Sequence, residues 1–134
     1  MRSATLALLV ACAAGTVSAQ QEVSTGTGAV LRGLDKLTGH VEDITLENGG
    51  SYQLGRLTIA LDECRFPKGN AVSDAFAFLT IMDEGEAEPA FRGWMMASSP
   101  ALNAMEHPRY DVWVMRCSTL SEAGSNETES SVEE

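Results

Sequence analysis

Hydrophobic positions in the middle of the chain follow a period of two or form short apolar runs, and helical spacing is almost absent. The stretch LTIALD at 57–62 alternates large apolar residues with smaller or polar ones, which is typical of a half-buried strand. The run at 75–82 is apolar except for Thr80, so it predicts a strand covered on both faces. Further strand candidates lie at 30–37, 41–46, 91–97 and 112–117. Short strands at this spacing predict an all-β domain, a small antiparallel barrel or sandwich.

Turn signals separate these strands, and one connection has helical character. Asn48-Gly49-Gly50 is a strong turn signal. The stretch 65–70 should end the strand that begins at 57 and start a loop. The acidic stretch 83–89 predicts an exposed hairpin connection. Between the last two strands, a serine, Pro100 and the residues that follow favour one short helix at 99–107, ended by Pro108. Leu102 and Met105 would then point inward.

The N-terminus reads as an export signal. Residues 1–19 contain Arg2, an apolar run from Leu6 to Ala14, and small residues that end at Ala19. Cleavage there predicts a periplasmic protein with a flexible segment at 20–28 and no later transmembrane segment. The alternative is a lipid anchor at Cys12, because Leu9-Val10-Ala11-Cys12 has the form of a lipobox.

The net charge of the chain excludes some classes of binding partner. The chain has 19 acidic and 9 basic residues, a net charge of −10, which argues against nucleic acid and against anionic lipid surfaces. The acidity is partly segregated, because 118–134 has five acidic residues and no basic or aromatic residue. This stretch predicts a disordered acidic tail and leaves one β domain at 29–117.

Two cysteines remain outside the leader, Cys64 and Cys117. An even number in an oxidising compartment predicts a disulfide, which the chain-entropy model values at about 4 kcal/mol. The alternative is two separate buried thiols that pack as small hydrophobic residues. No Cys-x-x-Cys redox motif is present in the sequence.

Catalytic chemistry has weak support in the sequence. Ser98 or Ser99, His107 and Asp111 lie close together, but no Gly-x-Ser-x-Gly motif surrounds either serine. Triads also assemble from distant segments, so local clustering is poor evidence for one. We therefore predict no enzymatic activity, no catalytic residue and no cofactor.

The alternative function is a periplasmic module that binds a small ligand or a metal ion, copper in particular. Thioether and imidazole groups suit copper, and the candidates are Met82, Met95, Met96, Met105, Met115 and His107. Without Met-x-Met or His-x-His spacing, these methionines are more typical of core packing, so no metal site is assigned.

Trp94 and Trp113 lie on the two strands that flank the expected helix. Such residues pack within a sheet or anchor an interface, where tryptophan and arginine are enriched. The candidate interface residues are Arg92, Trp94, His107, Arg109, Tyr110 and Trp113.

Three segments carry a family resemblance: LRGLDKLTG at 31–39, FRGWMMASSPAL at 91–102 and EHPRYDVWV at 106–114. The chain resembles domain-of-unknown-function family 2155, small exported proteins of alphaproteobacteria, over residues 29–117. That family has no established activity, and Cys64 and Cys117 stand where its cysteines are expected. Its members are often encoded beside an accessory subunit of respiratory complex I. The resemblance therefore implies a non-enzymatic accessory protein that contacts subunits of an inner-membrane respiratory complex, complex I, at its periplasmic face.

Overall fold

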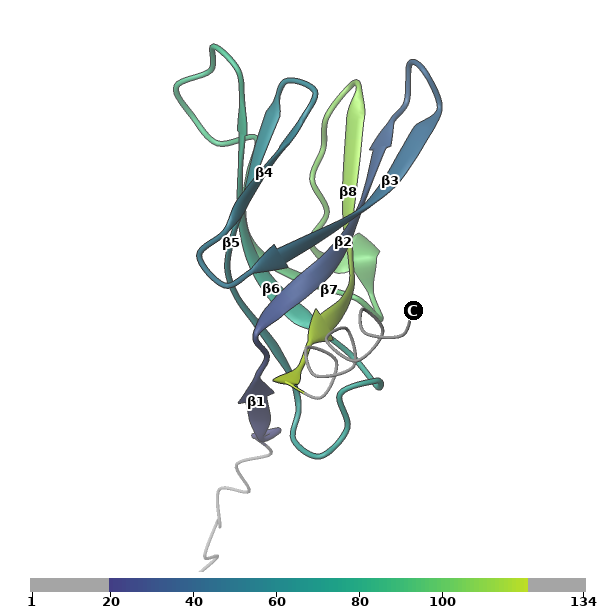
Figure 1. The fold of residues 1–134 in the computed structure, drawn as a ribbon. Coiled ribbons are helices and arrows are strands. Elements are labelled where there is room, and N and C mark those ends of the chain that lie inside the picture. The colour runs from purple at the N-terminus through teal and green to yellow at the C-terminus, as the bar shows by residue number, and fades with distance from the viewer. Residues whose placement is uncertain (1–19, 121–134) are drawn as a thin grey trace, which may run out of the picture.

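The computed structural model describes residues 20–120, which form eight short strands and one 3₁₀ turn (Figure 1). The predicted export signal and residues 121–134 of the predicted tail lie outside the described residues. The elements are β1 (Val23–Thr25), β2 (Gly28–Asp35), β3 (His40–Glu47), β4 (Ser51–Leu54), β5 (Leu57–Pro67), β6 (Phe76–Asp83), β7 (Phe91–Met96), the turn Pro100–Leu102, and β8 (Tyr110–Ser118).

The strands form two antiparallel sheets, which confirms the all-β prediction. One sheet has the order β1-β5-β6-β7, with β4 also paired to β5, and the other has the order β3-β2-β8. No ladder joins β7 to β8, so the sheets do not close into a barrel. Every predicted strand falls on an observed one, whereas β1 and β4 were not predicted.

β5 pairs with β6 on one side, and its other edge is also hydrogen-bonded along most of its length. This pairing explains why β5 is longer than predicted and why residues 23–25 are ordered. β4 pairs with 57–60, the β3–β4 turn exchanges backbone bonds with Leu61, and β1 pairs with 65–67. β5 therefore continues to Pro67 instead of ending at 65, because β1 supplies it with a partner strand. Residues 23–25, in the segment expected to be flexible, are held in that ladder.

The core lies between the two sheets and is filled by alternate side chains of both. β6 shows the pattern: Ala77, Leu79 and Ile81 are fully buried, whereas Phe76, Phe78 and Met82 are only partly buried. The expectation of a strand covered on both faces was therefore wrong. No second layer packs on the outer face of this sheet within residues 20–120, so its apolar side chains reach the surface.

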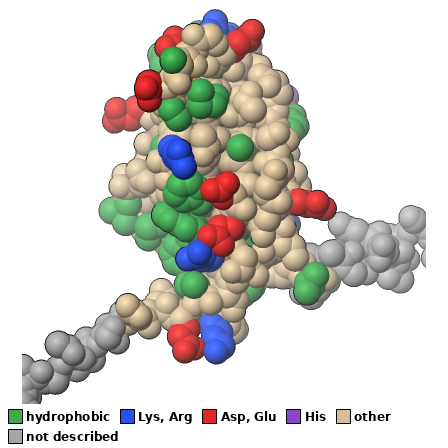
Figure 2. Space-filling view, turned by 90° about the vertical axis from the view of Figure 1, so that its left-hand side faces the viewer, with side chains coloured by type: hydrophobic (Ala, Val, Ile, Leu, Met, Phe, Trp, Pro, Cys, Tyr) green, Lys and Arg blue, Asp and Glu red, His purple; other side chains and the backbone are tan. Residues whose placement is uncertain are grey.

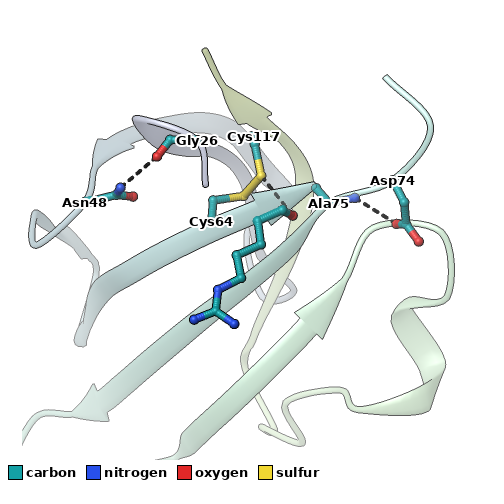
Figure 3. The surroundings of a disulfide bond; sticks show 7 residues. Gly26, Asn48, Cys64, Asp74, Ala75 and Cys117 are labelled. Carbon is teal, nitrogen blue, oxygen red and sulfur yellow. Dashed lines mark hydrogen bonds between the residues drawn. A yellow bond between two sulfur atoms is a disulfide. The ribbon is translucent and has the colours of Figure 1, made fainter. Parts of the chain in front are cut away.

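The predicted disulfide is present and links the two sheets (Figure 3). Cys64 of β5 and Cys117 of β8 are bonded at an Sγ–Sγ distance of 2.08 Å, and both residues are buried. Nearby, the Asn48 side chain donates to the Gly26 carbonyl oxygen at 2.8 Å, which ties the β3–β4 turn to the β1–β2 connection.

The helix expected at 99–107 is reduced to the 3₁₀ turn Pro100–Leu102, without a side-chain cap at Ser99. The Asn103 amide donates to the Trp94 carbonyl oxygen at 2.8 Å, and this bond draws the segment toward β7 and out of helical conformation. Met105 is buried as expected, but Leu102 is 72% exposed. No helix within residues 20–120 has the length and apolar character needed to cross a membrane.

Candidate functional site

The outer face of the five-stranded sheet carries a patch of large apolar side chains. The outer patch consists of Phe76, Phe78, Met82, Trp94 and Met96, none of which is fully buried. Antiparallel pairing sets Phe78 beside Trp94 and Phe76 beside Met96. Figure 2 shows hydrophobic side chains gathered on this side of the molecule, with charged groups among them. A solvent-facing sheet surface normally alternates to polar residues, so this face departs from the usual pattern.

Arg65 orders the centre of the outer patch. The Trp94 ring meets Phe78 edge-on at a centroid distance of 5.3 Å, and the Arg65 guanidinium lies 5.0 Å from the Trp94 ring centroid. Arg65 is itself fixed by a 2.6 Å hydrogen bond from its Nη2 to Glu63. The indole is thus held between a phenyl edge and a cation, and part of it still faces solvent.

Arg92 stands at the border of the outer patch. It lies two residues before Trp94 on β7, opposite Thr80, and its side chain is exposed. Unlike Arg65, it makes no salt bridge within residues 20–120. The outer patch therefore combines an aromatic anchor with an arginine whose charge has no partner in the described part of the chain.

The structure does not bring the six predicted interface residues into one surface. Trp94 and Arg92 lie on the five-stranded sheet, whereas Trp113 lies on the outer side of the three-stranded sheet, opposite Arg32 of β2. His107, Arg109 and Tyr110 lie at the corner that leads into β8, and Tyr110 is only 2% exposed. The sequence correctly indicates that these residues flank one connection, but they face three directions.

His107 organises that corner. Its Nδ1 accepts the backbone N–H groups of Arg109 and Tyr110, both at 3.0 Å, so Nε2 carries the proton and donates to Asp83 at 2.9 Å. This hydrogen bond holds the pKa of Asp83 below its ordinary value, and Arg56 acts in the same direction. Both ring nitrogens are engaged, which gives the imidazole a structural task.

Asp35 and Arg109 form the second polar link at this corner. Arg109 donates to the Asp35 carboxylate through Nε and Nη2, at 2.8 Å for the shortest contact. This hydrogen bonding lowers the pKa of Asp35 to about 2. The Arg109 guanidinium also lies 5.0 Å from the Tyr110 ring centroid, and the Tyr110 hydroxyl accepts the backbone N–H of Arg56 at 3.3 Å.

Ser98, one of the two serines of the triad hypothesis, is engaged elsewhere. The Ser98 hydroxyl donates to Asp74 at 2.6 Å, and its backbone N–H donates to the same carboxylate at 3.0 Å. Asp111 accepts its neighbour's backbone N–H, from Val112, at 3.1 Å. The three residue types therefore belong to separate hydrogen-bonded groups.

The methionines proposed for copper are also divided. Met95, Met96 and Met105 line a cleft of about 250 Å³ together with Trp113, whereas His107 lines a different cleft. Met82 and Met96 belong to the outer patch, so Met96 borders both the patch and this cleft, and Met115 is exposed on β8. No group of three or more histidine, cysteine or acidic side chains within residues 20–120 is arranged to hold a metal ion.

Several residues of these groups were not singled out from the sequence. Phe78 belongs to the outer patch, Arg65 packs on the Trp94 ring of that patch, and Asp35 and Asp83 fix the corner. The missing alternation in 75–82 was the available signal for Phe78, because an apolar residue at every position leaves some of them outside the core. The two aspartates carried no comparable signal.

Comparison with known proteins identifies the family of this chain. The family model described as "Uncharacterized protein conserved in bacteria (DUF2155)" matches residues 29–117. The chain belongs to the DUF2155 family. This confirms the resemblance, and the matched range has the bounds predicted for the β domain. An uncharacterized protein of Rickettsia prowazekii (strain Madrid E) is 30% identical over 94 residues, 68% of this chain and 61% of that protein. The chain thus spans less than two thirds of that relative's length. No solved structure matches the chain significantly.

Proposed function

We propose that this DUF2155 protein is a non-enzymatic interaction protein that binds a protein partner outside the cytoplasm through the outer patch. The observation that carries the proposal is the Trp94–Phe78 aromatic pair, with Arg65 over the Trp94 ring, on a sheet face where polar side chains are expected. Tryptophan and arginine in this arrangement are typical of binding hot spots. The disulfide is compatible with an extracellular or periplasmic location.

Charge narrows the chemistry of the partner. Arg65 is neutralised by Glu63, but Arg92 has no salt bridge within residues 20–120. A matching surface offers apolar side chains against Trp94 and a carboxylate opposite Arg92. Such pairing orients a docked protein and suppresses wrong partners more than it adds affinity.

The partner we propose is the periplasmic face of respiratory complex I in the inner membrane. This choice is supported by the gene neighbourhood that the family resemblance implies. An accessory subunit of this kind needs a specific surface and no catalytic group, which suits a small disulfide-linked β domain.

The test is gentle detergent extraction of host membranes, native gel separation and mass spectrometry of each band. We expect the wild-type chain to co-migrate with complex I and a Trp94→Ala variant to be lost from that band. A hot-spot tryptophan contributes at least about 2 kcal/mol, roughly a 30-fold loss of affinity.

Trp113→Ala is the matched control, because it removes a partly buried tryptophan from the opposite sheet. It should stay in the complex I band. If the wild-type chain co-migrates with no respiratory complex, the partner is wrong. If the two variants dissociate equally, the outer patch is not the docking surface.

A further inference from the structure

The β4–β5 turn and the β6–β7 connection lie at the same end of the sandwich (Figure 1). A cleft of about 590 Å³ opens there. It shares no lining residue with the outer patch. Its charged lining residues come from three segments and are Arg56, Asp83, Glu86, Glu88 and Arg109. Pro89 and Pro108 are among its apolar lining residues. The volume is in the range of small-molecule sites.

Two guanidinium groups in this cleft are fixed by neighbours. Arg109 uses Nε and Nη2 for Asp35, and Arg56 uses Nε for Asp83 and Nη2 for the Glu84 carbonyl oxygen at 2.8 Å. Neither Nη1 has a hydrogen-bond partner within residues 20–120. Tyr110 connects the two arginines, because its ring contacts one guanidinium and its hydroxyl binds the Arg56 backbone. Anchored guanidiniums of this kind are suited to carboxylate recognition.

The acidic residues of the cleft lack such partners. Glu86 and Glu88 are exposed on the β6–β7 connection and make no salt bridge within residues 20–120. Asp35 and Asp83 already pair with the two arginines, so these two glutamates leave the cleft with an excess of negative charge. This excess repels a simple anion and attracts a cationic group, whereas the two Nη1 donors favour a carboxylate on the same ligand.

We propose that this cleft binds a basic amino acid or the basic C-terminus of a peptide. The ligand's carboxylate meets Arg56 and Arg109, and its cationic side chain faces Glu86 and Glu88. The aliphatic stem between these groups lies along Pro89 and Pro108, which are exposed in the cleft. This ligand matches both signs of charge in the cleft, and the site acts independently of docking through the outer patch.

The experiment is a titration of ¹⁵N-labelled protein followed by backbone amide shifts. We expect L-lysine to shift residues 84–90 and 107–110 in a saturable way. L-norleucine, which lacks the side-chain ammonium, and lysinamide, which lacks the carboxylate, should bind roughly five- to tenfold more weakly. Gly-Gly-Lys distinguishes the source, because tighter binding than lysine identifies a peptide terminus and weaker binding identifies a free amino acid.

The variant Glu86→Gln/Glu88→Gln should bind lysine and norleucine equally. The control Glu47→Gln/Asp62→Asn makes the same change of charge at exposed positions outside the cleft and should keep the preference for lysine. Three results would overturn the proposal: no saturable shift up to about 20 mM lysine, equal binding of lysine and norleucine by the wild type, or loss of the preference in the control.

Discussion

His107 donates its Nε2 proton to Asp83 at 2.9 Å while its Nδ1 accepts two backbone N–H groups at the start of β8. Asp83 ends β6 in one sheet, and β8 belongs to the other. The disulfide makes the corresponding link between β5 and the end of β8. Because no ladder joins β7 to β8, these links at the two ends of β8 fix one sheet against the other.

Replacing His107 by alanine should lower the free energy of unfolding by about 2–3 kcal/mol, because two partly buried N–H groups lose their acceptor. His107→Asn should recover part of this loss, since its Oδ1 can replace Nδ1 as acceptor while the bond to Asp83 is absent. Urea denaturation at neutral pH measures both variants. A loss below about 0.5 kcal/mol for the alanine variant, within the usual range for surface substitutions, would contradict this role.

Removing the disulfide with Cys64→Ala/Cys117→Ala should cost about 4 kcal/mol, since the bridge closes a long loop in the unfolded chain. The sequence separation of the two cysteines is 53 residues. Guanidinium denaturation of oxidised, reduced and double-variant protein measures the effect. The reduced protein should behave like the variant. Equal midpoints for all three samples would show that the bridge contributes nothing to stability.

The strand positions could be predicted because a period of two is a local property. The stretch 57–61 alternates in sequence, and in β5 Leu57, Ile59 and Leu61 are buried. The disulfide followed from a count of two cysteines and an expected compartment, with no knowledge of their distance. β4 escaped prediction because Ser51–Leu54 has a single buried residue and shows no alternation.

The grouping of surface residues could not be predicted, because it depends on which sheet each strand joins. Trp94 and Trp113 would be adjacent if β7 and β8 were neighbours in one sheet, but β8 pairs with β2 in the other sheet. Trp94 thus shares its face with Phe78 and Arg65. The helix predicted at 99–107 was wrong for a similar reason. The hydrogen bond from the Asn103 side chain to the Trp94 carbonyl is a tertiary contact, which local helix propensity cannot predict.

The stability of the protein should fall in acid as Asp35 is protonated. Its pKa is about 2 in the folded protein, below the ordinary value of 3.8, because Arg109 hydrogen-bonds the ionised form. Above about pH 5 the full contribution is present. It is lost as the pH falls through 3.8, where the unfolded chain takes up the proton first, toward the folded pKa of about 2. Asp35→Asn should therefore be less stable than wild type at neutral pH and show a flatter decline below pH 4.

Urea denaturation between pH 2 and 7 tests the role of Asp35. Asp43→Asn is the control, because Asp43 also pairs with an arginine, Arg32, but on the exposed face of the same sheet. We expect its profile to stay closer to that of the wild type, since exposed pairs contribute little. If the free energies of unfolding of wild type and Asp35→Asn fall in parallel from pH 5 to 2, another carboxylate causes the loss of stability in acid.

Gly55→Ala should be among the most destabilising single-methyl additions to the fold. Gly55 has a φ of +55°, and a Cβ there would collide with the Tyr110 hydroxyl group. Gly39→Ala is the matched control, because Gly39 has a φ of +74° with no atom within 4 Å of the added methyl. The control should lose only the backbone cost of about 1 kcal/mol, whereas Gly55→Ala must also displace a core tyrosine and should lose at least about 3 kcal/mol. Thermal and urea unfolding of both variants give the comparison, and equal losses would mean that Tyr110 can move aside without disturbing the corner.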